Sequence, residues 1–67
     1  MAGERKRTIL LVEDEAIIAL NERLMLEKHG YGVIVVHRGE DAVDLARTNP
    51  EIDLVLMDID LGRGISG

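Results

Sequence analysis

Three short apolar runs, separated by two segments of helix-forming residues, constrain the fold of this chain more than any other feature. The runs cover residues 8–12, 31–36 and 52–57, and the segments between them, 15–29 and 40–48, contain neither Gly nor Pro. An uninterrupted apolar run of this length is typical of a strand buried on both faces. Helical crossovers place such strands parallel, with right-handed connections. The chain is therefore predicted to be an α/β protein with a βαβαβ order and a parallel sheet.

The longer helical segment carries an apolar stripe and signals at both ends. Ile17, Leu20 and Leu24 are spaced i, i+3 and i+7, which places them on one face of a helix. We expect this face to pack against the sheet rather than to bind a partner. Asp14 is placed to cap the helix N-terminus, and Gly30 is placed to end the helix.

Composition limits the kinds of site that the chain can hold. Its 67 residues form at most one small domain, and a net charge of −5 with Tyr31 as the single aromatic residue argues against a nucleic-acid surface. Without Cys, disulfides and thiolate metal sites are excluded. No apolar stretch approaches the ~20 residues of a membrane-spanning helix. We expect a soluble, cytoplasmic protein that begins with a flexible segment at residues 1–7.

Acidic residues follow two of the predicted strands. Glu13 and Asp14 close the first strand, and Asp58 closes the third. Each acid taken alone could simply cap the helix or turn that follows it. However, the carboxyl ends of parallel strands lie at one edge of a sheet, so these carboxylates should meet if the two strands are neighbours. A divalent cation such as Mg2+ relieves the repulsion between close carboxylates, and a carboxylate beside it is placed to attack phosphorus and form an acyl phosphate.

Two motifs contain the ends of these strands. They are ILLVEDE, from Ile9 to Glu15, and DLVLMDIDLGRGISG, from Asp53 to Gly67, with HGYGV and GEDAVDLA between them. In this order and spacing, the motifs resemble the receiver domain of bacterial two-component response regulators over essentially the whole chain. The resemblance implies a flavodoxin-like parallel sheet with the strand order 2-1-3.

The same resemblance implies roles for four acidic residues. Asp58 is the phosphoacceptor, which receives its phosphoryl group from a sensor histidine kinase or a phosphotransfer protein. Glu13 and Asp14 form the acidic pair that holds Mg2+ together with Asp58, and Asp60 contributes a backbone carbonyl ligand. The Asp60 side chain is then available to control the access of water to the acyl phosphate. Such a domain takes part in its own phosphorylation and is not a turnover enzyme.

The chain also departs from the receiver pattern. Receivers have five strands and five helices, whereas this chain stops after its third predicted strand, without the Ser or Thr and the Lys that contact the phosphoryl group. We therefore expect the N-terminal half of a receiver, not fully competent in phosphorylation. In the order 2-1-3 the third strand is an edge strand, so residues 54–57 are expected to mediate self-association. The loop from Leu61 to Gly64 lacks the usual Pro and is one residue longer than the common version.

Two other interpretations remain open. An apolar strand that ends in Asp58-x-Asp60 also resembles haloacid-dehalogenase-type phosphatases, in which Asp58 is the nucleophile and Asp60 the general acid and base. That interpretation leaves Glu13 and Asp14 without a role. Alternatively, the chain is a non-catalytic, self-associating fragment.

The remaining motifs carry less weight. Gly62, Gly64 and Gly67 have the spacing of a dinucleotide-binding turn but open no helix, so we interpret them as a loop. His29 and His37 do not have a metal-ligand spacing, and His29 is placed to interact with a helix C-terminus.

Overall fold

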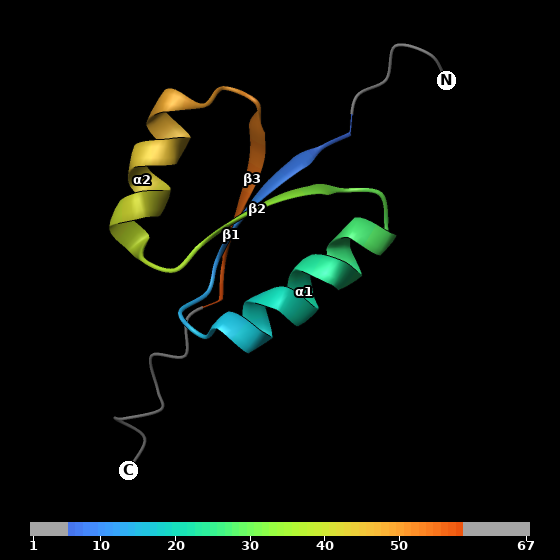
Figure 1. Cartoon of the computed structure of the whole chain (residues 1–67). Helices are drawn as coiled ribbons and strands as arrows, with labels where there is room; N and C mark the ends of the chain where they lie inside the picture. Colours follow the sequence, from blue (N-terminus) through green and yellow to red (C-terminus); the bar gives the residue numbers. More distant parts are fainter. Residues whose placement is uncertain (1–5, 59–67) are drawn as a thin grey trace.

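The structure is a computed structural model that describes residues 6–58 (Figure 1). Its elements are β1 (Thr8–Val12), α1 (Ala16–Lys28), β2 (Gly32–Val36), α2 (Gly39–Thr48) and β3 (Ile52–Met57). The bounds of β1 and β3 equal those expected from the sequence, and each of the other elements differs by one residue at one or both ends. The expectations for residues 1–5 and 59–67 lie outside the described residues. Within residues 6–58, no helix has the length and apolarity that crossing a membrane requires.

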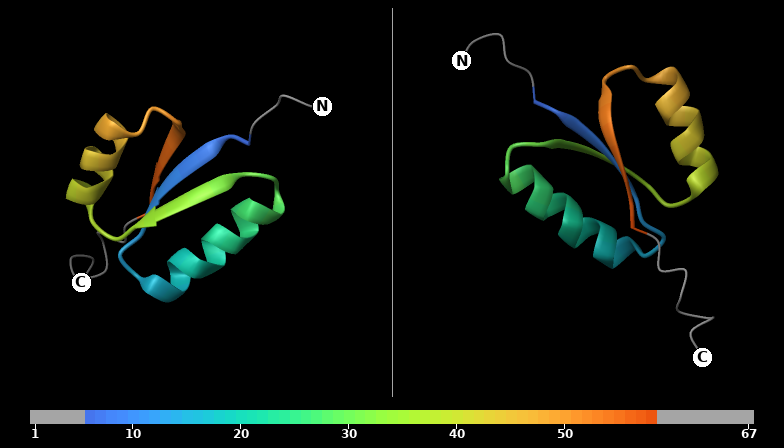
Figure 2. Two further views of the ribbon diagram at one scale, coloured as in Figure 1. Left: turned by 45° about the horizontal axis from the view of Figure 1, so that its top comes forward. Right: turned by 180° about the vertical axis from the view of Figure 1, so that it is seen from behind.

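The three strands form one parallel sheet with the order β2-β1-β3. This confirms the predicted fold class and strand order. The helices α1 and α2 lie on opposite faces of the sheet (Figures 1 and 2). Because the strands are parallel, the carboxyl ends of β1 and β3 lie side by side at one edge.

The central strand β1 is buried on both faces. Leu10, Leu11 and Val12 are each 0% exposed. Side chains alternate along a strand, so Leu10 and Val12 pack with Ala42 on the α2 face while Leu11 lies on the α1 face. Neighbouring strands on both edges take up the main-chain hydrogen bonds of β1. Burial on both faces explains why the sequence of this strand is uninterrupted by polar residues.

The strand β3 contains one residue more than β1 along their shared edge. Thr8 pairs with Ile52 and Ile9 pairs with Leu54, so Asp53 is the extra residue, at a β-bulge. The Asp53 carboxylate accepts a 2.8 Å hydrogen bond from the Thr8 N–H. Ile52 packs against the core on the α2 face, and the alternation restarts beyond the bulge with Leu54 on the α1 face.

The helix α1 packs on the sheet through a small residue and not through its predicted apolar stripe. Ala19 is buried, whereas Ile17, Leu20 and Leu24 are 76%, 49% and 52% exposed. The expectation that this stripe faces the sheet is therefore wrong. The backbone of α1 lies close to β2 and β1, and has no close contact with β3.

The ends of α1 differ in how well the sequence predicted them. The N-cap is Glu15 and not Asp14, so that prediction is wrong. The Glu13 carboxylate accepts a 2.9 Å hydrogen bond from the N–H of Glu15, the residue at which the helix is capped. At the other end, Gly30 has a φ of 96°, the left-handed conformation that commonly ends a helix.

We expect Leu10→Ala to unfold much of the protein. Truncating a buried Leu costs about 2–5 kcal/mol, and the single core of a chain this small supplies roughly 3–5 kcal/mol. The matched substitution Leu24→Ala removes the same atoms from an exposed position on α1 and should cost under about 1 kcal/mol. Urea denaturation followed by circular dichroism measures both, and equal losses would contradict the central role of β1.

Candidate metal centre

The carboxyl ends of β1 and β3 place two acidic residues next to each other. Val12 pairs with Met57, and the Asp58 N–H donates a 2.8 Å hydrogen bond to the Val12 carbonyl. Glu13 and Asp58 therefore follow paired residues on neighbouring strands. Since Val12 lies on the α2 face, alternation carries both acids to the face covered by α1.

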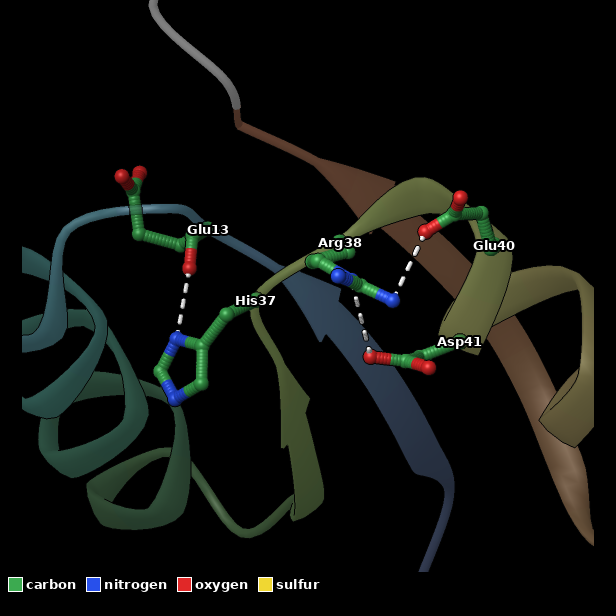
Figure 3. Close-up of polar contacts among 5 residues, drawn as sticks. All are labelled: Glu13, His37, Arg38, Glu40 and Asp41. Atoms are coloured by element: carbon green, nitrogen blue, oxygen red, sulfur yellow. Dashed lines mark hydrogen bonds and ion pairs between the residues drawn. The ribbon is translucent and has the colours of Figure 1, made fainter.

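Glu13 is fixed by three hydrogen bonds. Its N–H donates to the Val36 carbonyl at 3.0 Å, and its carboxylate Oε2 accepts from the Glu15 N–H at 2.9 Å. Its carbonyl oxygen lies 2.9 Å from Nδ1 of His37, whose imidazole ties the end of β2 to the end of β1 (Figure 3). Glu13 is only 2% exposed. Its carboxylate is thus buried and held in one position.

The helix α1 contributes a third carboxylate, that of Glu22. One oxygen from each of Glu13, Glu22 and Asp58 lies within 4.8 Å of the other two. Glu22 follows the buried Ala19 by three residues, so it lies on the helix flank next to the sheet. Its Oε1 atom is buried and has no hydrogen-bond partner among the described residues. We call these three residues the acidic cluster.

Proximity and burial raise two pKa values in the acidic cluster. A side-chain hydrogen bond with Asp58, burial, and the charges of Asp58 and Glu13 raise the pKa of Glu22 to about 7. The pKa of Glu13 is raised as well. The hydrogen bond from the Glu15 N–H lowers it, but burial and the neighbouring Asp14 and Asp58 outweigh that effect. Negative charge is therefore unfavourable in the cluster unless something positive compensates it.

A hard divalent cation fits the acidic cluster. Carboxylate oxygens are the ligands that Mg2+ and Ca2+ prefer. The buried Glu22 Oε1 lacks a hydrogen-bond partner among residues 6–58, and a cation would give it one. Positive charge would also remove the repulsion that raises the pKa of Glu22 and Glu13.

A separate group of charges lies at the start of α2. Arg38 is 3.1 Å from Glu40 and 3.8 Å from Asp41, and all three side chains are exposed (Figure 3). Exposed ion pairs of this kind contribute little to stability. Within residues 6–58, Arg38 is thus paired with the acids of its own helix.

The structure brings together only part of the predicted site. Glu13 and Asp58 meet as expected, whereas Asp14 is exposed and is not among the three residues of the acidic cluster. Asp60 lies outside the described residues. The sequence analysis missed Glu22 and the hydrogen bond from His37. The available signal for Glu22 was its spacing in the sequence. It is a charged residue in a helix rich in apolar residues, and it follows the small residue Ala19 by three positions.

Comparison with known proteins identifies the family. A model of the response regulator receiver domain matches residues 9–67, and the chain belongs to this family. The family is the one that the strand-end motifs resemble. The matched proteins give no support to the haloacid-dehalogenase interpretation.

Several curated proteins are similar to this chain. The phyllosphere-induced regulator PhyR of Methylorubrum extorquens is 37% identical over 68 residues, covering 100% of this chain and 26% of PhyR. The transcriptional regulatory protein CpxR of Escherichia coli is 43% identical over 51 residues, 76% of this chain and 21% of CpxR. The cell cycle response regulator CtrA of Brucella ovis is 34% identical over 53 residues, 79% of this chain and 22% of CtrA. The chain spans about a quarter of the length of these relatives. No solved structure matches it.

Without a divalent cation, Glu22 should make the fold less stable as the pH rises from about 4.5 to about 7. The folded protein keeps the Glu22 proton up to a pKa of about 7, whereas the unfolded chain releases it near 4.5. The folded state therefore binds more protons in this window, and the free energy of unfolding decreases with pH. Glu22→Gln is neutral at every pH and should lose most of this decrease.

Urea denaturation in EDTA, repeated between about pH 4.5 and pH 8, measures this effect. Glu51→Gln is the matched control, since Glu51 is exposed and outside the acidic cluster. The control should keep the wild-type slope. If Glu22→Gln kept it too, the cluster would not be the source of the pH dependence.

Proposed function

We propose that Asp58 is the phosphoacceptor of this receiver domain and takes its phosphoryl group from a phosphohistidine on a sensor histidine kinase or a phosphotransfer protein. The observation that carries the proposal is the meeting of Asp58 with Glu13 and Glu22, whose oxygens lie within 4.8 Å of one another. A carboxylate oxygen of Asp58 attacks phosphorus and forms a P–O bond. The P–N bond of the phosphohistidine breaks, and the imidazole nitrogen leaves with the electron pair.

The proposed metal ligands come from the same edge of the sheet. We propose Glu13 and Asp58 as ligands of Mg2+ among the described residues, together with Asp14 and the backbone carbonyl of Asp60, which the family resemblance implies. When bound, Mg2+ supplies positive charge that offsets the carboxylates and the phosphoryl oxygens. Glu22 adds a third described carboxylate. Because the pKa of Glu22 is about 7, metal binding there would displace a proton near neutral pH.

The proposed domain accepts one phosphoryl group per molecule and does not turn over substrate. Phosphate release from many substrate molecules by each protein molecule would instead favour the phosphatase interpretation. A cytoplasmic location, expected from the family resemblance, is part of this proposal. We propose no direct contact with nucleic acid, in keeping with the net charge of −5.

Self-association through β3 is a further part of the proposal. It is supported by the exposure of four consecutive apolar residues of this strand, Leu54, Val55, Leu56 and Met57. The kinase or phosphotransfer protein remains the partner in phosphorylation, and a second copy is the partner in assembly.

Mg2+ should stabilise the protein by binding at the acidic cluster. A ligand at ten times its Kd that binds only the folded state adds about 1.4 kcal/mol, and EDTA should reverse the gain. Because binding displaces the Glu22 proton, the apparent Kd should fall by up to about tenfold per pH unit between about pH 5 and 7. Urea denaturation with Mg2+ and with EDTA measures the gain in stability, and isothermal titration calorimetry measures the apparent Kd. Glu13→Gln should weaken binding and Glu51→Gln should not; equal affinities would place the metal elsewhere.

Asp58→Asn should abolish formation of the acyl phosphate. In the experiment, the natural protein that contains this sequence is incubated with acetyl phosphate and Mg2+. The acyl phosphate is detected by its lability to hydroxylamine. Asn has no carboxylate nucleophile but nearly the same shape, so the loss should be complete. Glu51→Gln should label like the wild type, and labelling of Asp58→Asn would remove Asp58 from the mechanism.

A further inference from the structure

The imidazole of His37 holds the main chain at the point where β1 leaves the sheet. Its Nδ1 atom lies 2.9 Å from the carbonyl oxygen of Glu13 (Figure 3). Because a carbonyl oxygen carries no proton, Nδ1 must be the donor, so the ring carries a proton on this nitrogen. In Figure 3 the carboxylate of Glu13 points away from the ring. His37 therefore acts on the backbone of Glu13 and not on its carboxylate.

This hydrogen bond continues the pairing of β1 with β2 beyond the last paired residues. Val12 and Val36 are the last pair in the register, and the Glu13 N–H still donates to the Val36 carbonyl at 3.0 Å. In a parallel ladder, the Glu13 carbonyl would next take its donor from the main chain beyond Val36. The chain turns into α2 there, with Arg38 as the N-cap of the helix. The side chain of His37 supplies the donor instead.

Both peptide groups that flank Glu13 are thus held by hydrogen bonds. In the first, between Val12 and Glu13, the oxygen accepts from the Asp58 N–H at 2.8 Å and the nitrogen donates to β2. In the second, between Glu13 and Asp14, the oxygen accepts from His37. A peptide group is planar, so a hydrogen bond to its oxygen restricts the rotation of the whole group. The second group joins two of the proposed Mg2+ ligands, and its orientation sets the position of Asp14 relative to Glu13.

We propose that His37 is a positioning residue of the metal centre, which fixes the peptide group between Glu13 and Asp14 so that both acids reach one Mg2+ ion. This inference rests on the Mg2+ site proposed above and adds a residue that supports its ligands without touching the metal. Loss of a partner that orients a metal ligand commonly weakens metal binding by roughly 10–100-fold. Because His37 holds the main chain of the ligands, we expect a loss near the lower limit, about tenfold.

The surroundings of the ring argue against a role in packing. His37 is exposed, whereas Glu13 is 2% exposed, so the ring gives a donor to the main chain of a buried residue. The ring also lines an open cavity of about 230 Å3, whose other lining residues are Ala16, Ala19, Leu20, Arg23 and Val35. A side chain that packs in a core has no such space beside it.

Two substitutions of His37 separate positioning from packing. His37→Asn loses the ring and keeps a donor, because the side-chain nitrogen of Asn is as many bonds from Cα as Nδ1 of His. His37→Phe keeps a ring and loses the donor. We expect His37→Phe to raise the Kd for Mg2+ about tenfold, and His37→Asn to stay within about twofold of the wild type. Wild-type affinity in His37→Phe, or an equal loss in both variants, would overturn the inference.

Isothermal titration calorimetry of the natural protein that contains this sequence measures the Kd. His29→Phe is the matched control, because Nδ1 of His29 lies 2.9 Å from the Met25 carbonyl, at the end of α1 opposite to Glu13. It removes the same kind of hydrogen bond from another main-chain oxygen and should bind Mg2+ like the wild type. If His29→Phe weakened binding as much as His37→Phe, the specific role of His37 would be overturned. Circular dichroism checks that each variant is folded.

Nitrogen-15 NMR of the wild-type protein tests the hydrogen bond without a substitution, and it decides the question if a variant fails to fold. In the neutral ring of His37, the proton should lie on Nδ1, since the acceptor is a carbonyl oxygen. A neutral ring with its proton on Nε2 would overturn the inference, because Nδ1 could not then donate to Glu13.

The outcomes also separate the role of His37 from the metal centre on which it rests. If the wild-type protein binds no Mg2+, or if Glu13→Gln binds it equally well, the proposed metal centre is wrong and the role of His37 falls with it. If Glu13→Gln weakens binding and His37→Phe does not, the metal centre stands and the positioning role of His37 is overturned.

Discussion

The fold depends on β1 being enclosed on every side. Its two edges are paired with β2 and β3, and its two faces are covered by α1 and α2. In a chain of 67 residues this strand supplies most of the fully buried side chains, Leu10, Leu11 and Val12. The residue that follows it, Glu13, is also buried and is hydrogen-bonded to Val36 and Glu15. The position of the acidic cluster is set by the same contacts that hold the sheet together.

The acidic cluster works against this stability. Burial and mutual repulsion disfavour the ionised forms of Glu13 and Glu22, as the raised pKa of each shows. A group in such an environment destabilises the folded state at neutral pH, and groups of this kind are common at binding and catalytic sites. A divalent cation would offset this negative charge, and it would also offset the charge that the proposed phosphoryl transfer to Asp58 brings to the same edge.

Some parts of this structure could be read from the sequence and others could not. The bounds of β1 and β3 followed from apolar runs that end in acids, although only β1 is buried on both faces and β3 includes the polar residue Asp53. The orientation of α1 did not follow. Apolar residues occupy most of its circumference, so the stripe of Ile17, Leu20 and Leu24 did not identify the buried side, which is marked by the small residue Ala19.

The acidic cluster was also predictable from the sequence only in part. The approach of Glu13 to Asp58 was predictable, since both follow neighbouring parallel strands. Glu22 joins them because of the way α1 packs on the sheet, with Ala19 buried one turn earlier, and helix periodicity alone does not show which side is buried. Contacts between side chains of different elements depend on packing, which single-sequence patterns describe poorly.

The bulge at Asp53 affects which face of the sheet the side chains of β3 reach. Ile52 must reach the α2 face and Asp58 the α1 face, and these requirements conflict in a strand of strict alternation with six steps between them. The bulge resolves the conflict, because Asp53, tied to Thr8, stands outside the alternation and leaves five alternating steps. Asp58 therefore stays beside Glu13 only while β3, apart from its bulged residue, matches β1 residue for residue, because a further insertion would shift Asp58 along the strand or turn it to the other face.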